Sequence, residues 1–595
     1  MLKKVSLYLS IILTLIILIV GLAFISSIFF PFEIVKPKID SLAFDKSFDF
    51  FTPEFYIISK YIGMGIILIG VLLCIFIKNI GLFFYNLLKC LASFTKDLIK
   101  KFLIFIQDKD KLHLITFFII LLFSFIIRLL FINQPIRYDE AYTFVHFVKN
   151  PLWMTVADFR STNNHILHSI LVKISVKFFG DSLWAIRLPA FIFGILIVPM
   201  AYTIARAFFN KKTAIITMSI LSASSILIEF STNARGYTIV IFIFLVILGL
   251  ARYIKNNNNI FACVLFSFIS SLGFFTMPLM LYPFIVVIVW LFLSILKNDS
   301  PINKRTNLKN LIISIFLTII FTIILYSRAI FKFGINSAIS SNISSGSRPW
   351  SYFFTDQWNF IKAIWLEWNR DIPLVLQIFL AICFVLALIF HRKISKYKIN
   401  LFIPVIICFI PIVLIQKNSI VFPRHWLFLL LLYVMTAAAG FVLIIELIQN
   451  KIRFKKPLII PIISLILSIG LCLSVFFSQS VLKSDDTGTF REAENITIYI
   501  NKNLQKDDIV LAPSYITKPI LTYYFNRYKT QGLCFKFKDI EPVLNKINNI
   551  YIIITKDQNL NDMIDFKVLQ EHKYNYPKLL ETYDSSYIYE LQKLK

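Results

Sequence analysis

The chain has 595 residues, of which 58% are hydrophobic and 16% charged, and its formal net charge is +28. Soluble domains are about 45–50% apolar, so this composition excludes an ordinary soluble protein and indicates a chain surrounded by lipid. The positive charge does not indicate binding to nucleic acid, because the basic residues lie in short clusters between apolar runs, as membrane proteins use them to fix orientation.

Thirteen apolar segments are long enough to cross a bilayer, where helices satisfy their own backbone hydrogen bonds. The first one is too long for a cleavable signal peptide, so we interpret it as an uncleaved span. We therefore expect an α-helical polytopic membrane protein with about thirteen transmembrane helices. In chain order the expected spans are 7–30, 56–77, 113–132, 187–205, 213–230, 237–254, 260–276, 279–296, 309–327, 372–390, 399–416, 427–448 and 457–479.

Short basic clusters alternate along the chain with longer connections that are poorer in Lys and Arg. The clusters at 3–4, 206–212 and 392–398 belong to the basic set. Because cytoplasmic loops carry the excess of basic residues, we expect a cytoplasmic N-terminus and, after thirteen spans, a C-terminus outside the cell membrane.

The stretch 78–112 differs from the spans because it mixes apolar and basic residues. Phe83 and Leu87 alternate with Lys89 and Lys96. This pattern is typical of an amphipathic helix on an anionic membrane surface. A disordered basic linker is the alternative that the sequence leaves open.

Two of the outward connections are long. The first, 133–186, has the pattern of short helices at the membrane interface. The second, 328–371, contains a Ser-rich flexible loop at 340–347, followed by an aromatic segment from Trp350 to Trp368.

The outward tail, 480–595, alternates between helix and strand patterns. Helices are predicted at 490–504 and 519–528, and strands at 508–512 and 551–555. We expect a small C-terminal α/β soluble domain, in which no catalytic motif is found.

Asp139 and Glu140 directly follow the third span. A carboxylate at the membrane edge, beside aromatic residues such as Tyr138 and Tyr142, is well placed to serve as a general base. The structural alternative is a solvated acidic pair in a loop.

Further charged residues border the outward ends of other spans. His165 and His168 are three residues apart and share a helix face. They can bind phosphate when protonated, bind a metal together with the carboxylates, or serve as an ordinary polar helix start. Glu229 and Arg235 lie near the end of the fifth span, either paired with each other or with Arg235 free for an anionic headgroup.

Arg424, in Pro423–Trp426, stands at the outward start of the twelfth span. Two outward arginines beside apolar helices suit a lipid phosphate, because guanidinium groups match phosphate oxygens. Interfacial anchoring is the alternative. The seven cysteines show neither a disulfide framework nor a metal-binding spacing, and we expect no metal or other cofactor.

These motifs and their order resemble the membrane glycosyltransferases of the GT-C superfamily. The resemblance rests on the Asp139–Glu140 pair, His165, the segments 184–190 and 231–237, and the late Arg424. It is greatest over residues 113–255. The chain looks most like the branch that holds the protein O-mannosyltransferases, the lipid A aminoarabinose transferases and the Rgt-type lipopolysaccharide glycosyltransferases, close to glycosyltransferase family 39.

The resemblance implies a sugar donor linked to a polyprenyl phosphate and an acceptor that is a lipid, a glycan or a protein. Asp139 corresponds to the family's catalytic Asp and Glu140 to its neighbour. In the mechanism it implies, Asp139 deprotonates the acceptor hydroxyl, which displaces the lipid phosphate with inversion. The candidate residues for binding substrate or lipid phosphate are Arg137, His165, Glu229, Arg235, Tyr237 and Arg424.

The resemblance also implies an inner (plasma) membrane protein of a bacterium, with a periplasmic C-terminal domain and membrane lipids around it. We divide the chain into a two-span N-terminal extension with a cytoplasmic amphipathic helix, a GT-C-like catalytic module and the C-terminal domain. These cover residues 1–112, 113–479 and 480–595.

The sequence departs from the family pattern at two positions. Ile166 and Leu167 replace the two prolines that follow the family's His. Asn233 replaces the Glu before Ala-Arg, and we expect Glu229, one turn earlier on the same helix face, to compensate.

Two other classes of function stay open. A lipid or oligosaccharide transporter or flippase would show charged residues in the middle of spans, or inverted repeats with broken helices. An O-antigen ligase or polymerase would depend on the 328–371 loop rather than on Asp139.

Overall fold

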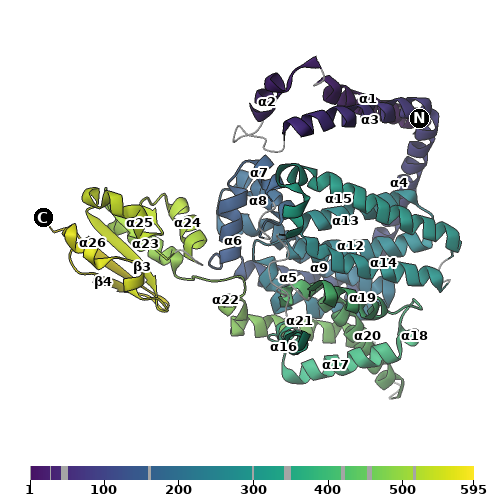
Figure 1. Ribbon diagram of the computed structural model, residues 1–595. Helices are drawn as coiled ribbons and strands as arrows, with labels where there is room; N and C mark the ends of the chain where they lie inside the picture. Colours follow the sequence, from purple (N-terminus) through teal and green to yellow (C-terminus); the bar gives the residue numbers. More distant parts are fainter. Residues whose placement is uncertain are drawn as a thin grey trace.

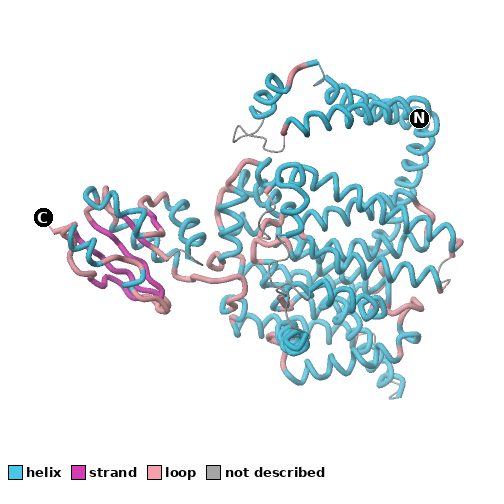
Figure 2. The backbone as a smooth tube through the Cα atoms, in the orientation of Figure 1, coloured by secondary structure: helices cyan, strands magenta, loops and turns pink. Residues whose placement is uncertain are grey.

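The structure is a computed structural model that describes residues 2–26, 29–41, 51–158, 163–297, 301–340, 350–416, 422–451, 458–513 and 517–594. It consists of a helical bundle and a small sheet domain at the C-terminus (Figure 2). The Ser-rich loop predicted at 340–347 lies, beyond its first residue, outside the described residues.

An N-terminal hairpin stands at the edge of the bundle (Figure 1). Its helices α1 and α3 pack closely, since a Cβ added to Gly21 would lie 2.7 Å from Ile67. The stretch predicted to be amphipathic is helical and joins the hairpin to the bundle as α4. The four helices of this part are α1 (Leu2–Ser26), α2 (Phe32–Ser41), α3 (Pro53–Ile75) and α4 (Ile77–Ile106).

A helix covers most of each of the thirteen predicted spans. Among the described residues, nine helices are long and apolar enough to cross a membrane, and the bent pair α10–α11 makes a tenth candidate. Helices α13, α17 and α19 fill the other three segments with 17, 16 and 15 residues. Besides α1 and α3, the elements of these segments are α5 (Lys111–Phe131), α9 (Leu183–Phe208), α10 (Lys211–Ser222), α11 (Ser225–Ser231), α12 (Tyr237–Asn256), α13 (Ile260–Thr276), η3 (Pro278–Met280), α14 (Leu281–Leu296), α15 (Lys304–Ser340), α17 (Leu374–Ile389), α19 (Phe402–Gln416), η4 (Pro423–Trp426), α20 (Leu427–Lys451) and α21 (Ile459–Ser478). The prediction of a polytopic helical membrane protein is confirmed.

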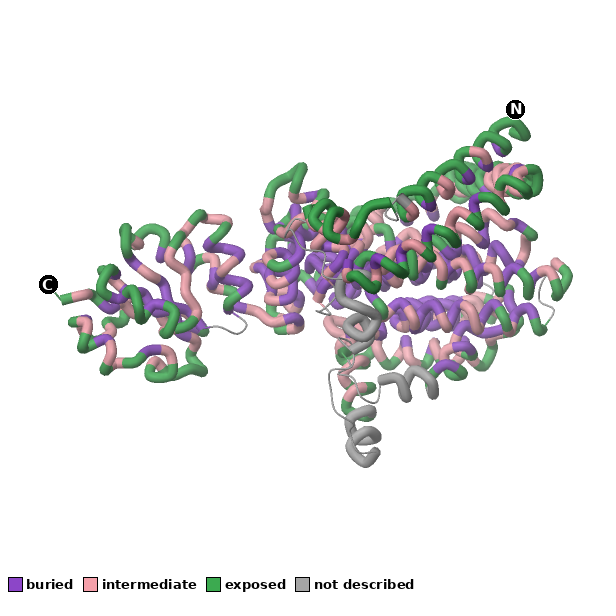
Figure 3. The backbone as a smooth tube through the Cα atoms, turned by 45° about the horizontal axis from the view of Figure 1, so that its top comes forward, coloured by how far each residue is buried: buried purple, intermediate pink, exposed green. Residues whose placement is uncertain are grey.

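Helices α10, α12 and α20 form the centre of the bundle, where the chain is most thoroughly buried (Figure 3). Helix α11 bends by 64° from α10, and the chain is unwound from Thr232 to Gly236 before α12 begins. An unwound stretch leaves backbone N–H groups without helical partners, so it needs other acceptors at the end of the bundle.

Short helices cover the end of the bundle that bears this break, as predicted for 133–186. They lie at the same end as the C-terminal domain, whereas the N-terminus lies toward the other end (Figure 1). The aromatic segment predicted after the Ser-rich loop is also helical. These elements are α6 (Tyr138–Thr143), the π-helix η2 (Phe144–Val148), α7 (Leu152–Ala157), α8 (Ile166–Phe179) and α16 (Trp350–Trp368), and the short α18 (His391–Ile394) follows α17.

The C-terminal domain is a five-stranded sheet in the order β2-β1-β3-β5-β4. Strand β1 pairs in parallel with β2 and β3, while β3, β5 and β4 pair antiparallel. All four predicted elements of the tail are present, but strands β2, β4 and β5 were not predicted. The elements are α22 (Ser480–Lys483), α23 (Ala493–Asn503), β1 (Ile509–Leu511), α24 (Thr517–Tyr528), β2 (Leu533–Cys534), α25 (Phe537–Ile540), η5 (Glu541–Lys546), β3 (Asn549–Thr555), η6 (Leu560–Asp562), α26 (Phe566–Glu571), β4 (Lys578–Thr582) and β5 (Ser586–Gln592).

Helix α24 docks this domain onto the segment that carries the Asp139–Glu140 pair. The rings of Phe144 and Tyr523 meet edge to face with centroids 5.4 Å apart. The Tyr524 hydroxyl accepts a hydrogen bond from the backbone N–H of Ile136 at 3.3 Å. The domain therefore supports the site from outside the bundle.

Candidate active site

Asp139 is the second residue of α6, and its side chain is 12% exposed. Its Oδ1 accepts a hydrogen bond from the Asn163 side chain at 3.2 Å. Its Oδ2 lies 3.8 Å from the Arg235 guanidinium, beyond hydrogen-bond distance. Asp139 thus keeps acceptor capacity on a largely buried side chain, as a general base requires.

Glu140 has the opposite surroundings, because its side chain is completely buried. Its two oxygens accept from Arg187 Nε at 2.8 Å and Nη2 at 2.7 Å, and from the backbone N–H groups of Ala234 and Arg137. Burial alone would raise the pKa of Glu140, but the charge and hydrogen bonds of Arg187 outweigh it and hold the pKa below its usual value. Glu140 is therefore an ionised, fully engaged carboxylate with no access to a substrate, and the catalytic role predicted for it does not fit this geometry.

Arg187 anchors the turn that leads into α6. Besides Glu140, its guanidinium binds the carbonyl oxygens of Ile132 at 2.7 Å and Gln134 at 2.6 Å. The segment 184–190 contributed to the family resemblance, but Arg187 itself was not among the predicted site residues. Its position explains why α6, and Asp139 with it, is held in place.

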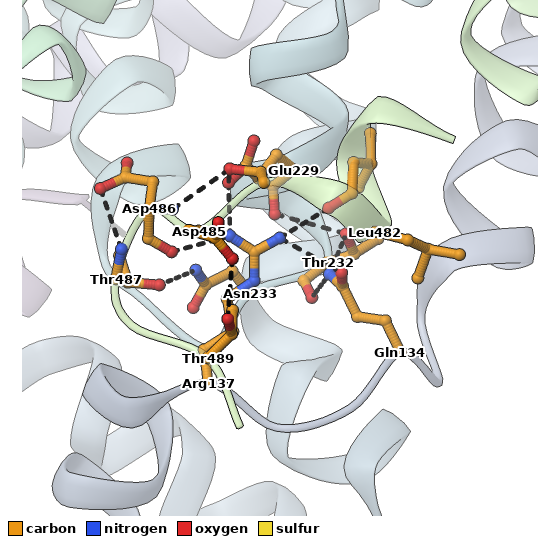
Figure 4. Close-up of polar contacts among 12 residues, drawn as sticks. Gln134, Arg137, Glu229, Thr232, Asn233, Leu482, Asp485, Asp486, Thr487 and Thr489 are labelled. Atoms are coloured by element: carbon orange, nitrogen blue, oxygen red, sulfur yellow. Dashed lines mark hydrogen bonds and ion pairs between the residues drawn. The ribbon is translucent and has the colours of Figure 1, made fainter. Parts of the chain in front are cut away.

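Arg137 and Glu229 form a second buried pair, with Arg137 at the centre of Figure 4. Arg137 also donates to the carbonyl oxygens of Val481 at 2.7 Å and Asp486 at 2.9 Å, and Glu229 also binds Arg370. Both side chains were predicted to bind substrate or lipid phosphate. In the structure their charges are matched within the protein, and their role in binding stays a prediction.

Asn233 stands where the family has a Glu, and we expected Glu229 to compensate for it. This expectation is wrong. Helix α11 ends at Ser231, so Glu229 and Asn233 do not share a helix face. The unwound stretch instead gives its backbone N–H groups to two side chains of the site, since Ala234 donates to Glu140 and Gly236 donates to His165 at 2.8 Å. The break in this span is therefore part of the site.

Arg235 lies between Asp139 and His165 on this unwound stretch. Its Nη1 donates to Thr143 Oγ1 at 3.0 Å and to the carbonyl oxygen of Asn163 at 2.9 Å. Its Nη2 lies 3.1 Å from His165 Nε2. Its Nε is buried and has no hydrogen-bond partner in the described part of the chain. Arg235 does not pair with Glu229, which is bound by Arg137 instead.

His165 caps the start of α8 and is buried. Burial and then the charge of Arg235 hold the pKa of His165 well below its usual value, so the ring is neutral. His165 therefore does not bind phosphate as a cation, as one interpretation of the sequence required. His168 is also buried with a pKa of about 3, and the described residues contain no cluster of His, Cys, Asp or Glu that could hold a metal ion.

Arg424 is the second residue of the turn η4, which leads directly into α20. Its Nε donates to the Tyr237 hydroxyl at 2.9 Å, and its Nη1 pairs with Asp486. Its guanidinium also faces the ring of Phe422, with 3.9 Å between its carbon and the ring centroid. Tyr237 in turn meets the ring of His165, with centroids 5.5 Å apart.

An apolar cavity of about 230 Å³ lies beside η4. The residue of η4 that lines it is Trp426, two positions after Arg424 in the sequence. Its walls come from α14, α16, α19 and the start of α20. The lining residues are Val286, Phe360, Ile361, Ile364, Trp365, Trp368, Val405, Phe409, Trp426, Phe428 and Leu429. All of the side chains that line the cavity are apolar or aromatic.

The contacts thus join Asp139, Arg235, His165, Tyr237 and Arg424 into one connected set. Arg137, Glu140 and Glu229 lie beneath it in ion pairs with Arg187 and Arg370. Sequence reasoning missed Arg187, Arg370 and Asp486 as members of this site. The one available signal was the cost of a charge near the membrane edge, which requires a partner but does not say which.

Two comparisons of the sequence with known proteins give different results. A family model described as dolichyl-phosphate-mannose-protein mannosyltransferase matches residues 164–326, a stretch that includes His165 and Arg235 but not Asp139 or Arg424. No curated protein matches the chain by sequence.

Solved structures resemble the chain over most of its length. ArnT from Cupriavidus metallidurans in the apo state is 12% identical, with a TM-score of 0.51 over 80% of this chain and 97% of that one. The same protein bound to undecaprenyl phosphate is also 12% identical over the same shares, with a TM-score of 0.50. The chain thus shares the fold of ArnT over most of the length of both chains.

A more distant GT-C structure is the oligosaccharyltransferase AglB from Archaeoglobus fulgidus in complex with an inhibitory peptide and a dolichol-phosphate. It is 9% identical, with a TM-score of 0.45 over 74% of this chain and 69% of that one.

Proposed function

We propose that this chain transfers a sugar from a polyprenyl-phosphate donor to a hydroxyl group of a lipid, glycan or protein acceptor, with Asp139 as the general base. The observation that carries the proposal is the connected set at the outward end of the bundle. It combines a carboxylate that keeps acceptor capacity, Asp139, with two guanidinium groups, those of Arg235 and Arg424. The ArnT structure with bound undecaprenyl phosphate supports the choice of donor.

The proposed reaction is one displacement at the anomeric carbon. Asp139 takes the proton of the acceptor hydroxyl, whose oxygen forms a bond to the anomeric carbon. The bond between that carbon and the phosphate oxygen breaks, and the polyprenyl phosphate leaves with the electron pair. Arg424 and Arg235 stabilise the charge that develops on the leaving phosphate, and the configuration inverts.

The apolar cavity beside η4 supports the place of the donor. A phosphate on Arg424 puts the first isoprene units of the donor against Trp426 and the aromatic wall of α16. Guanidinium groups bind phosphate oxygens in pairs, and an apolar groove suits a polyprenyl chain.

Glu140 has a positioning role in this proposal rather than a catalytic one. Its hydrogen bonds with Arg187 and with the unwound stretch hold α6 against the break between α11 and α12. Asp139 is the next residue on the same short helix, so this clamp fixes the base relative to Arg235.

We further propose the membrane arrangement that the basic clusters indicate. The N-terminus and α4 then face the cytoplasm, and the site and the C-terminal domain face the periplasm of a bacterial inner membrane. Residues 1–112 form an extension, 113–479 the catalytic module and 480–595 the outer domain. A cysteine-labelling map with a membrane-impermeant reagent tests this arrangement, and labelling of a cysteine placed in the C-terminal domain from the cytoplasmic side would contradict it.

The decisive experiment compares Asp139→Asn with Asp181→Asn, which removes a carboxylate from the turn after α8. Membranes or purified protein are assayed for sugar transfer from a polyprenyl-phosphate sugar. We expect Asp139→Asn to lower the rate by about 10³-fold without changing the melting temperature, and Asp181→Asn to keep near-normal activity. Full activity of Asp139→Asn would refute the proposal. A transporter would move the donor lipid without breaking the bond between sugar and phosphate, which the same assay detects.

A further inference from the structure

The segment Ser484–Thr489, here called the strap, links α22 to the C-terminal domain and lies beside Arg137 and Glu229 (Figure 4). Its carbonyl oxygens accept hydrogen bonds from the first turn of α6. The Tyr138 N–H donates to Gly488 at 2.9 Å, and the Asp139 N–H donates to Thr487 at 3.2 Å. The strap therefore touches the backbone of the proposed base itself.

The strap also places a carboxylate against the guanidinium group of Arg424, which is proposed to bind phosphate. The Asp486 carboxylate pairs with Arg424, while the Asp486 carbonyl accepts from Arg137. The Asp486 side chain is 37% exposed, so a ligand can reach it from outside. A carboxylate and a phosphate compete for the same N–H groups of a guanidinium.

The backbone of the strap has an unfavourable conformation at its centre. Thr487 has a φ of 70° and Gly488 a φ of 74°. The left-handed region suits Gly but is costly for a β-branched residue such as Thr. Contacts such as the hydrogen bond between Asn233 and Thr487 Oγ1 at 3.2 Å hold this turn, so losing the Asp486 pair weakens a strap that is already strained.

We propose that Asp486 occupies the phosphate site of the empty enzyme and is displaced when the donor binds. The inference rests on the proposed function, since it takes Arg424 as the residue that binds the donor phosphate. Because the same strap holds the Asp139 backbone, displacement of Asp486 connects the arrival of the donor to the position of the base. Asp486 is thus a positioning residue that belongs to the linker and not to the membrane helices.

The test measures binding of undecaprenyl phosphate, without sugar, to the purified full chain in detergent. Asp486→Asn is compared with Asp485→Asn, its neighbour, whose carboxylate binds Thr489 and Arg491 instead. If Asp486 leaves the site free for about a tenth of the time, its neutralisation should tighten binding about tenfold. Asp485→Asn should bind within twofold of the wild type. Unchanged or weaker binding by Asp486→Asn would overturn the inference.

Arg424→Ala separates this failure from failure of the proposed function. If Arg424→Ala abolishes binding while Asp486→Asn binds like the wild type, the phosphate site is correct and the inference about Asp486 is wrong. If neither the wild type nor any variant binds undecaprenyl phosphate, the proposed function fails and the inference fails with it. Melting temperatures check folding, and Asp486→Ser is the second uncharged variant. If neither variant folds, Asp486 is only a structural residue and the inference is overturned.

Discussion

Two layers of charged residues lie around the break between α11 and α12, and they use the same residue types for different purposes. In the lower layer, Glu140, Arg187, Arg137 and Glu229 are buried, and their charges are matched by ion pairs and carbonyl oxygens. In the upper layer, Asp139 and Arg235 meet only at 3.8 Å, and Arg424 is paired with a partly exposed carboxylate.

The two layers differ in how many of their hydrogen-bonding groups already have a partner within the protein. A buried ion pair contributes little net stability compared with apolar residues, but removing one partner leaves an unpaired buried charge and is costly. The lower layer therefore fixes geometry and cannot exchange its partners for a substrate. The upper layer keeps unused capacity, which a reacting hydroxyl and a phosphate can occupy.

The largest expected effect is loss of stability when the lower layer is broken. Arg187→Met leaves the completely buried Glu140 carboxylate without its partner and should destabilise the protein by about 3–5 kcal/mol. Melting temperature and yield in detergent measure the effect. The double variant with Glu140→Leu should recover part of the loss, and a single variant as stable as the wild type would place Arg187 outside the lower layer.

In the upper layer, we expect a loss of rate with little loss of stability. Arg235→Ala removes a cation beside Asp139 and should lower kcat by about 10²-fold, or about 2.7 kcal/mol. Sugar transfer under saturating donor measures it. Arg235→Lys keeps the positive charge but loses the paired N–H groups of the guanidinium. Its kcat should lie between those of the wild type and Arg235→Ala. A drop in melting temperature as large as that of Arg187→Met would make Arg235 a structural residue.

At the border between the layers, Arg370 tests whether the number of ion-pair partners that remain decides how much stability is lost. Arg370 is 17% exposed and shares Glu229 with Arg137, so Arg370→Gln leaves that carboxylate with one cation. The expected cost is about 1 kcal/mol, measured as a small fall in melting temperature. Arg137→Gln should lower the melting temperature clearly more than Arg370→Gln. Equal effects would show that the two arginines contribute equally to stability.

The smallest effect concerns pH. The buried His168 has a pKa of about 3 in the folded protein against about 6.5 when unfolded, so the unfolded state binds the extra proton first. Stability should therefore fall as the pH drops from about 6.5 toward 3. His168→Phe removes this contribution, and its melting temperature should depend less on pH over this range. An unchanged pH dependence would show that His168 does not titrate on unfolding.

The sequence predicted the bundle because composition alone identifies apolar spans, and it predicted the upper layer because the order of Asp139, His165, Arg235 and Arg424 resembles a known family. It did not predict the lower layer. Arg137 and Arg235 are chemically alike, and only tertiary structure shows that one is matched by Glu229 and the other is not.

Two further features escaped the sequence for physical reasons. The end of α11 at Ser231 depends on side chains that accept the freed N–H groups, and these come from Glu140 and His165, far away in the chain. Strands β4 and β5 were missed because the tail was interpreted from its most apolar runs. β4 in particular has little buried surface to mark it.

The contacts of Arg137 also constrain the order in which this protein is made. Arg137 is synthesised early, and Glu229 follows 92 residues later, but the carbonyl oxygens of Val481 and Asp486 come 344 and 349 residues later. Because chains emerge from the ribosome N-terminal end first, the lower layer stays incomplete until the linker that follows α21 has been made. A chain interrupted before residue 481 would thus present the quality-control machinery of the cell with a half-matched arginine.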